Sequence, residues 1–189
     1  MEKMAKQSRK DWVRAGLQRL AERGIEAVRV EVLAKTLGVT KGSFYWHFKD
    51  RAELLDAMLE DWAHVATENV IATTERASSD PELRLKRLIE IASEGYFTDL
   101  ELALRNWARN EPAVGKIVDE VDRRRMDFVR GLMRELGFGA AETEARTYLL
   151  YASLLGKDLL ADAHGRFGRK RVLRDSVELL TSPVRTTRT

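Results

Sequence analysis

The sequence predicts an all-α fold, with a small helical domain at the amino end and a larger helical domain after it. Apolar residues recur at three- and four-residue spacing along most of the 189 residues, which is the period of an amphipathic helix. Only 3 prolines are present, and runs of β-branched residues are few. Glycines and short polar residues separate the periodic stretches, as expected at helix ends. We therefore expect helices throughout, divided into residues 1–51 and 52–189.

The first helix is predicted over residues 9–23. Its apolar residues Trp12, Val13, Leu17 and Leu20 lie on one face, and Gly24 follows the last of them, where helices commonly end. Residues 1–8 contain two lysines and little that could be buried. We expect them to form a mobile basic arm.

Two short helices are predicted next, joined at Gly38. The first has the apolar stripe Val30, Leu33, Ala34 and Leu37. Val39 can fill the corner between the helices, and the hydroxyl of Thr40 is expected to cap the second helix by accepting a backbone N–H. In that helix, over residues 40–48, Phe44 and Phe48 lie four apart and are expected to face inward.

The other residues of this second helix, Lys41, Ser43, Tyr45, Trp46 and His47, are then left to face outward or sideways. A cation, hydroxyls and aromatic rings on a short helix suit the major groove of DNA, where lysine can contact guanine acceptors and an aromatic edge can contact a thymine methyl. An aromatic run alone is more often part of a core. Core packing, however, does not require Lys41 and Tyr45 to project together, so the pattern favours a helix-turn-helix.

Charge is distributed unevenly along the chain. Residues 1–51 contain 12 Lys and Arg against 6 Asp and Glu, whereas residues 52–189 contain 21 against 24. A basic amino-terminal part on a mildly acidic body indicates an anionic partner bound at one end, although a solvated basic face is the simpler alternative. The helix-turn-helix lies within the basic part, which favours DNA.

From Val30 to Leu55 the chain resembles the DNA-binding domain of TetR-type (tetracycline repressor) regulators. The match comprises Leu33-Ala34, Gly38-Val39-Thr40, Lys41-Gly42-Ser43-Phe44-Tyr45, His47-Phe48, Arg51 and Leu54-Leu55. The resemblance implies that Tyr45 and Arg51 bind phosphates. It also implies that the groove is lined from Thr40 to His47, by Thr40, Lys41, Gly42, Ser43, Trp46 and His47. One departure is Arg29, which stands where the family usually has a capping Thr or Ser; a direct contact from Arg29 to a phosphate is a plausible substitute.

Further helices are predicted through the body of the chain. Asp50-Arg51-Ala52-Glu53 resembles a capping box, which would open a long helix to about residue 76. After a break at residues 78–80, Pro81 begins a helix whose stripe ends at Tyr96. Others are expected at 100–110, 112–136, 141–163 and 169–180, and residues 182–189 are expected to be a disordered tail.

The helix expected over residues 141–163 is apolar nearly all round at its centre. Such a helix must be covered by protein on more than one side, most simply by a second copy of the chain. Ala145, Ala152 and Gly156 allow close helix approach. We therefore expect a homodimer in which this helix and residues 169–180 pair with their twofold mates in a four-helix interface.

The family resemblance also implies a small-molecule effector that binds in the helical body and weakens operator binding. Large side chains that could surround it are Tyr96, Phe97, Leu100, Leu104, Trp107, Met126 and Tyr148. An aromatic stripe is more often core than pocket, so core packing is the competing interpretation. Asp122 and Arg125, one turn apart, are expected to form a structural ion pair.

Other functional classes find little support in the sequence. There is no cysteine, the three histidines are scattered, and no glycine-rich phosphate loop or nucleophilic serine motif occurs. We expect no enzyme, cofactor or metal site. No stretch approaches 18 apolar residues and the amino end lacks a signal-peptide core, so a cytoplasmic location is expected. The prediction is a homodimeric, ligand-responsive transcriptional regulator that represses from a palindromic operator, with activation as the alternative sign. A ligand-blind DNA-binding protein is the main alternative, with a carrier or enzyme well behind.

Overall fold

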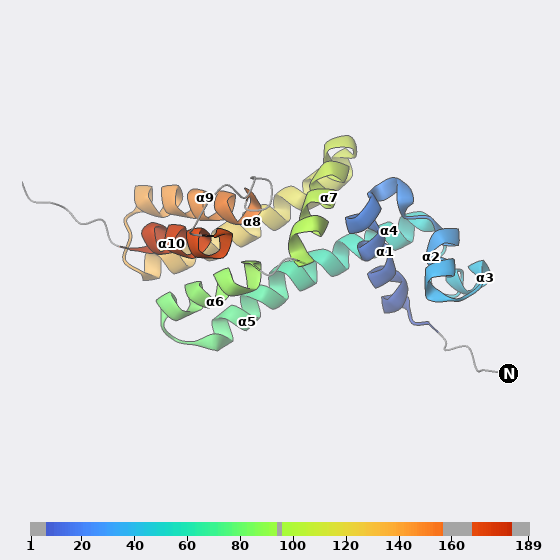
Figure 1. Cartoon of the computed structure of the whole chain (residues 1–189), viewed down its shortest axis with the longest axis horizontal. Helices are drawn as coiled ribbons and strands as arrows, with labels where there is room; N and C mark the ends of the chain where they lie inside the picture. Colours follow the sequence, from blue (N-terminus) through green and yellow to red (C-terminus); the bar gives the residue numbers. More distant parts are fainter. Residues whose placement is uncertain (1–6, 94–95, 157–167, 183–189) are drawn as a thin grey trace, which may run out of the picture. The chain divides into compact units, whose positions relative to one another are not determined.

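The computed structural model describes residues 7–93, 96–156 and 168–182, and every regular element in these residues is helical (Figure 1). This confirms the predicted all-α class. The helices in order are α1 Arg9–Arg23, η1 Ile25–Ala27, α2 Val30–Leu37, α3 Lys41–Phe44, α4 Arg51–Ala63, η2 His64–Glu68, α5 Asn69–Ala77, α6 Pro81–Ser93, α7 Tyr96–Asn110, α8 Pro112–Glu135, α9 Ala140–Gly156 and α10 Arg169–Thr181.

By its contacts the chain forms two compact units. The first comprises Met1–Asn69 with Gly95–Val121, and the second comprises Val70–Glu94 with Asp122–Thr189. Helix α7 thus belongs to the same packed unit as α1–α4. These units do not coincide with the expected domains 1–51 and 52–189, and the assignment of DNA binding and effector binding to those two domains stays a prediction.

The core of the first unit joins α1, α2, α3, α4 and α7. Its most deeply buried members are Trp12, Leu20, Leu33, Phe44, Phe48, Leu54, Met58, Trp62 and Leu104. The inward stripe expected on the first helix and the inward position of Phe44 and Phe48 are confirmed. Helix α1 approaches α4 closely at Gly16, where an added Cβ would lie 2.5 Å from the Met58 sulfur. A side chain at position 16 would therefore separate α4 from α1.

The ends of α1 and α2 follow from their sequences. Ser8 and Asp11 cap α1 reciprocally, with the Ser8 N–H donating to the Asp11 carboxylate at 2.8 Å and the Asp11 N–H donating to Ser8 Oγ at 3.3 Å. Helix α2 ends at Gly38, whose φ of +68° lies in the left-handed region that glycine adopts without strain. The predicted turn between the two short helices is therefore present.

The second short helix differs from its prediction in two respects. Regular α-helix ends at Phe44, not at Phe48, because the His47 N–H bonds to the Phe44 carbonyl at 2.9 Å in a tighter turn. Thr40 is the N-cap residue, but its hydroxyl makes no capping hydrogen bond, so that expectation was wrong. Instead the Ser43 hydroxyl donates to the Thr40 carbonyl at 2.9 Å.

The long helix expected after Asp50 is present but contains a π turn, η2, between α4 and α5. Asp50 caps α4 as predicted, with its carboxylate accepting the Glu53 N–H at 2.9 Å. The return bond of the expected capping box goes to a neighbour, because Glu53 Oε2 accepts from the Lys49 N–H at 2.7 Å. The π turn adds a residue to the helical repeat, which a search for 3.6-residue periodicity does not detect.

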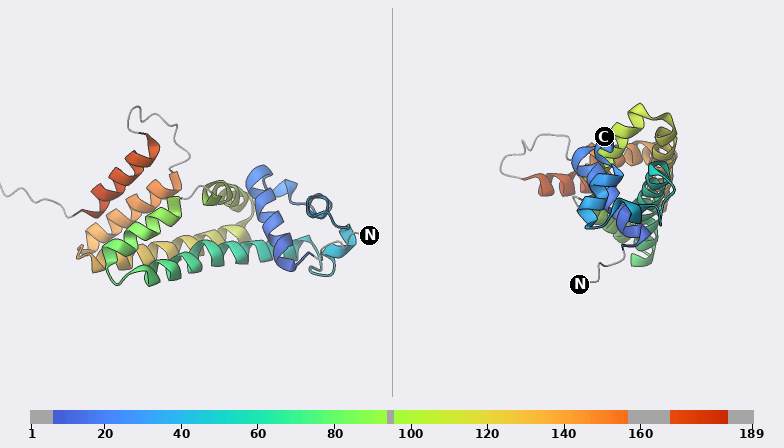
Figure 2. Two further views of the ribbon diagram at one scale, coloured as in Figure 1. Left: turned by 60° about the horizontal axis from the view of Figure 1, so that its bottom comes forward. Right: turned by 90° about the vertical axis from the view of Figure 1, so that its right-hand side faces the viewer.

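The second unit packs α6, α9 and α10 with the second half of α8. Figures 1 and 2 show α10 beside α9. The core that the four helices share contains the buried residues Leu85, Leu88, Val129, Leu132, Met133, Leu150 and Val177. Arg146 on α9 donates from Nη1 to the Leu180 carbonyl on α10 at 2.7 Å, and Arg84 on α6 pairs with Glu135 on α8. Helix α6 begins as predicted, with Asp80 accepting the Glu82 N–H at 2.8 Å.

Some expectations differ from the structure or fall outside its described part. Tyr96, expected at the end of the helix that begins at Pro81, is instead the first residue of α7. Residues 1–6 of the expected arm, residues 157–163 of the expected long helix and residues 183–189 of the expected tail lie outside the described residues. Among the helices that are described, none has the length and apolarity needed to cross a membrane.

Candidate nucleic-acid interface

Helix α3 rests on an aromatic cluster. The Phe44 ring meets Trp12 edge to face with centroids 5.2 Å apart and lies parallel to Phe48 at 5.3 Å. The Arg9 guanidinium covers the Phe48 ring at 4.7 Å. Aromatic pairs of this geometry add about 0.5–1.5 kcal/mol beyond the area that they bury. The short helix is thus held from its inner side, which leaves its outer side free to contact a partner.

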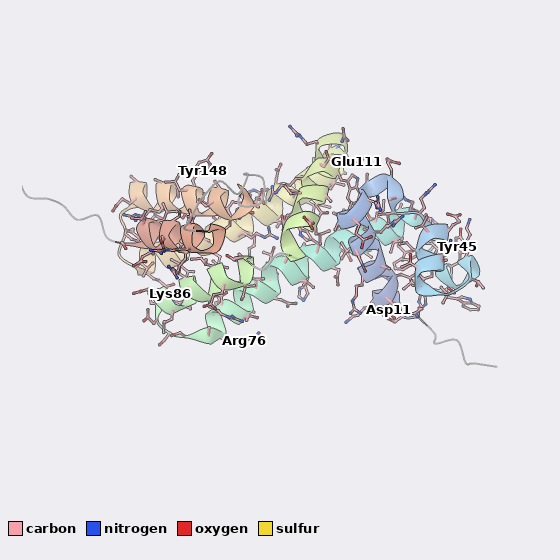
Figure 3. The ribbon with its side chains drawn as sticks, viewed as in Figure 1. Asp11, Tyr45, Arg76, Lys86, Glu111 and Tyr148 are labelled. Carbon is pink, nitrogen blue, oxygen red and sulfur yellow. The ribbon has the colours of Figure 1, made fainter. Side chains whose placement is uncertain are left out.

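Two large aromatic side chains project from the outer side of this turn. The side chain of Tyr45 is 56% exposed and that of Trp46 is 85% exposed. Figure 3 shows Tyr45 beside α2 and α3. Tryptophan at such exposure contributes little to the stability of its own chain, and it is enriched where proteins bind partners. Lys41 and Gly42 are exposed beside them.

The remaining predicted DNA contacts surround this surface. Arg29 is exposed at the N-cap position of α2, and its side chain makes no hydrogen bond that caps this helix. Thr40 is exposed, and Ser43 and His47 are half-buried. The helix-turn-helix therefore includes Arg29, Thr40, Lys41, Gly42, Ser43, Tyr45, Trp46 and His47, and contact of each with DNA stays a prediction.

Arg51 has a role within the fold that the sequence did not indicate. Its Nε donates to the Val28 carbonyl at 2.6 Å and its Nη2 donates to the Ile25 carbonyl at 2.9 Å. These bonds join the first residue of α4 to the η1 turn that leads into α2. A phosphate contact by Arg51 stays a prediction, and the side chain is half-buried and already holds two backbone acceptors.

Lys41 is paired with a residue that sequence analysis missed. Its Nζ lies 2.5 Å from Oε1 of Glu31, and both side chains are more than half exposed. The hydrogen bond from Lys41 lowers the pKa of Glu31, and the bond to Glu31 raises the pKa of Lys41, so the charged pair is favoured. The two residues are ten positions apart on different helices, and only the angle of the turn brings them together.

The seven expected pocket residues do not form one cluster in the described part. Leu100, Leu104 and Trp107 are buried together in the core of the first unit. Met126 is half-buried in the second unit, where Tyr148 is 65% exposed on α9. The side chains of Tyr96 and Phe97 lie outside the description. Beside Leu104, the buried Glu101 accepts a hydrogen bond from Trp62 Nε1 at 3.0 Å, a tie between α7 and α4 that no sequence pattern indicated.

A half-buried polar cluster lies between α8 and α9. The Tyr151 hydroxyl donates to Asp122 at 2.6 Å. Burial raises the pKa of Tyr151 to about 12; the nearby positive charge of Arg125 opposes the rise, and the carboxylate of Asp122 adds to it. Asp122 and Arg125 thus act together with a tyrosine that the expected two-residue ion pair did not include. Among the described residues, no group of His, Asp and Glu is arranged to hold a metal ion.

Helix α9 exposes a row of apolar and small side chains. Ala145, Tyr148, Leu149 and Ala152 are all exposed and recur at the spacing of one helical face. On the neighbouring α10, Leu179 is also exposed. Contiguous apolar surface of this kind marks a site of protein association more often than a free surface.

Comparisons with known proteins agree with this geometry. Residues 13–58 match the family model described as bacterial regulatory proteins, tetR family. The chain is 29% identical over 182 residues to the transcriptional regulator AcuR of Cereibacter sphaeroides, a match that covers 91% of this chain and 78% of AcuR.

Solved structures show the same fold. A putative transcriptional regulator of the TetR/AcrR family superposes with a TM-score of 0.78 at 16% identity, over 95% of this chain and 100% of the other. AibR, in complex with isovaleryl coenzyme A and operator DNA, superposes with a TM-score of 0.69 at 16% identity, over 93% and 98% of the two chains. This chain belongs to the TetR family of DNA-binding transcriptional regulators.

Proposed function

We propose that the protein is a homodimeric repressor that occupies a palindromic operator and leaves it when a small molecule binds. The observation that supports this most strongly is the helix-turn-helix surface. Lys41 is exposed at the start of α3, Tyr45 and Trp46 are exposed on the turn that follows it, and Phe44 supports this segment from within. A stable fold gains little from exposing two large aromatic rings. A DNA groove gives them contacts.

In this proposal each subunit inserts residues 40–47 into one major groove. Lys41 donates to guanine, Trp46 contacts a thymine methyl, and the hydroxyls of Thr40 and Tyr45 contact phosphates, as does Arg29. Two such elements related by a twofold axis fit half-sites about 34 Å apart, or a multiple of that distance. Repression follows if the bound dimer occludes polymerase.

The proposed dimer forms through α9 and α10. In a twofold interface the same surface patch of both subunits meets its own copy. The exposed row on α9 would be that patch. Small Ala145 and Ala152 let the two copies of α9 approach closely, and Tyr148 and Leu149 supply the apolar area. Burial of these side chains in the dimer accounts for their exposure in the single chain.

An effector can act through α7. This helix packs on α1 and belongs to the same core as α4, and Glu101 on α7 bonds to Trp62 on α4. A ligand that contacts Leu100, Leu104 or Trp107 has to repack α7, and α1 and α4 move with it. The same structural relative, AibR, was solved with both isovaleryl coenzyme A and operator DNA. An effector releases DNA only if it binds one arrangement of the DNA-binding helices more tightly than the other.

The test begins with selection of duplexes from a randomised library by the purified wild-type protein. We expect an enriched palindrome, and no enrichment would contradict the proposal. Binding of the enriched duplex is then measured for Lys41→Ala, with Lys35→Ala as a control of equal charge change on α2. Lys41→Ala is expected to cost about 1–3 kcal/mol and to relax preference at one base pair of each half-site. An equal loss for every operator variant would show that Lys41 contacts no base.

A further inference from the structure

Glu31 lies next to Lys41 in the helix-turn-helix. Its carboxylate lies on the first turn of α2, 2.5 Å from the Lys41 ammonium at the start of α3. Both side chains are exposed, so the pair is not needed to satisfy buried charges. An exposed ion pair of this kind contributes little to stability, typically about 0–1 kcal/mol. Its position in the helix-turn-helix, on the segment where Tyr45 and Trp46 are also exposed, suggests that it serves binding instead.

The pair presents a donor and an acceptor side by side. Lys41 has three N–H donors and uses one for Glu31, and the carboxylate of Glu31 has further lone pairs beyond the one that Lys41 occupies. Lys41 and Glu31 can therefore keep their mutual hydrogen bond and each form a further hydrogen bond to a base. It offers donors at the ammonium and an acceptor at the carboxylate, separated by one hydrogen-bond length.

One base pair presents the complementary pattern in the major groove. Guanine offers the N7 and O6 acceptors, and the cytosine opposite offers an N4 amino donor next to O6. O6 and N4 are themselves hydrogen-bonded, about 2.9 Å apart. Lys41 can span N7 and O6 while Glu31 accepts the free N4 proton. In a T·A pair the O4 acceptor and N6 donor offer only part of this match, because a methyl group replaces the second acceptor.

We propose that Glu31 and Lys41 act together as a single reader of one G·C pair, and that Glu31 is a specificity-determining residue. The inference rests on the proposed DNA-binding function of this surface. Lys41 alone tolerates any base that offers an acceptor, and it is equally attracted to phosphates. With Glu31 beside it, a base pair that lacks the adjacent amino group leaves the carboxylate facing an acceptor or a methyl group. Glu31 thus excludes wrong sequences as well as supporting the right one.

The experiment uses the full chain and the duplex that the wild type enriches. At the base pair whose preference Lys41→Ala relaxes, cytosine is replaced by 2-pyrimidinone, which lacks only the 4-amino group. Affinity for both duplexes is measured by fluorescence anisotropy at fixed salt for the wild type, Glu31→Ala and the control Glu26→Ala. Glu26 is an exposed carboxylate on η1, so its variant changes the charge of the same unit equally.

We expect the wild type and Glu26→Ala to lose about 5- to 150-fold in affinity on the modified duplex, the range that one base contact provides. Glu31→Ala should bind both duplexes within about 2-fold of each other, beyond the loss that the weakened base pairing causes in every variant. The inference is overturned if Glu31→Ala remains as sensitive as the wild type. It is also overturned if Glu31→Ala tightens binding to all sequences equally, because that result is simple charge repulsion.

Failure of the inference and failure of the proposed function give different results. If the wild type enriches no sequence, the proposed function fails before Glu31 is tested. If the wild type enriches a palindrome and Lys41→Ala relaxes one base pair that Glu31→Ala leaves unchanged, the DNA-binding function stands and the pairing of Glu31 with Lys41 in recognition is wrong.

Discussion

At the scale of single residues, Arg51 joins two segments that the DNA-binding surface depends on. Its two bonds to the carbonyls of Ile25 and Val28 fix the start of α4 against the turn before α2. Hydrogen bonds from a charged group to the backbone are worth about 1.5–3 kcal/mol, and removal of the donor leaves the carbonyls with one partner fewer. Arg51 therefore matters for the fold whatever it contributes to DNA.

We expect Arg51→Ala to lower the free energy of unfolding by about 1.5–3 kcal/mol, measured by urea denaturation. Arg14→Ala is the control, because Arg14 is mostly exposed and its ion pair with Asp11 spans 3.9 Å; a change below about 0.5 kcal/mol is expected. Equal stabilities of the two variants would show that the backbone bonds of Arg51 add nothing. If the salt dependence of DNA affinity also flattens in Arg51→Ala, Arg51 contacts a phosphate as well.

Tyr151 predicts a pH dependence of stability. Its pKa is raised from the ordinary value of about 10 to about 12, chiefly by burial, so the folded state retains the phenol proton longer than the unfolded state. Stability from this group is fully present below pH 10 and is lost as the pH rises toward 12. In Tyr151→Phe this loss is absent. The difference in unfolding free energy between wild type and Tyr151→Phe should change between pH 10 and 12 in urea titrations; a constant difference would contradict the raised pKa.

Residue-level prediction from sequence succeeded where one periodicity determines the outcome. The four-residue spacing of Phe44 and Phe48 placed both inward, and it left Lys41, Tyr45 and Trp46 outside. Prediction from sequence failed where a polar side chain has several possible hydrogen-bond partners. The hydroxyl of Thr40 does not cap its helix, and Glu31 meets Lys41 only because the turn at Gly38 sets the angle between α2 and α3. Such contacts depend on three-dimensional geometry that spacing does not contain.

At the scale of elements, the turn between α2 and α3 depends on the backbone of Gly38. Its φ of +68° is costly for any residue with a Cβ, about 1–2 kcal/mol, and no atom lies within 4 Å of the position that a Cβ would take. The cost of substitution is therefore conformational and not steric. Gly131, within α8, has the same open surroundings but ordinary helical geometry.

We expect Gly38→Ala to lower the free energy of unfolding by about 1–2 kcal/mol. Gly131→Ala should raise it by up to about 1 kcal/mol, because alanine loses less conformational freedom in a helix. Both values come from urea denaturation of the full chain. The opposite signs identify backbone conformation as the cause, and a loss of similar size in both variants would refute it.

Helix positions were largely predictable from sequence, whereas irregularities within helices were not. The cap at Asp50, the proline at the start of α6 and the glycines after α1 and α2 gave several of the boundaries, whereas the cap of α1 by Ser8 was not predicted. The early end of α3 and the π turn over His64–Glu68 were missed, because a run of apolar residues looks alike in a 3.0-, 3.6- or slightly wider repeat over one turn. The pocket was also poorly predictable, since Leu100, Leu104 and Trp107 are large apolar residues that serve equally well as core.

At the scale of the whole molecule, the proposed dimer predicts the effect of a charge on α9. Ala152→Glu would place a carboxylate next to its own copy across a twofold axis, in an apolar contact. We expect monomers by sedimentation equilibrium and operator affinity reduced by at least about 100-fold, because both half-sites are no longer bound together. Ala113→Glu, an equal change at an exposed position on α8, should remain dimeric. A dimeric Ala152→Glu would place the interface elsewhere.

The proposed function requires the outer side of α3 to contact base edges in the major groove, and methylation protection on the enriched duplex detects such contacts. Dimethyl sulfate modifies guanine N7 in the major groove and adenine N3 in the minor groove. The wild type should protect guanines in two clusters about one helical turn apart, or a multiple of that spacing, and Lys41→Ala should lose protection of one guanine in each cluster. Unprotected guanine N7 throughout the bound site, or protection of adenine N3 alone, would contradict it.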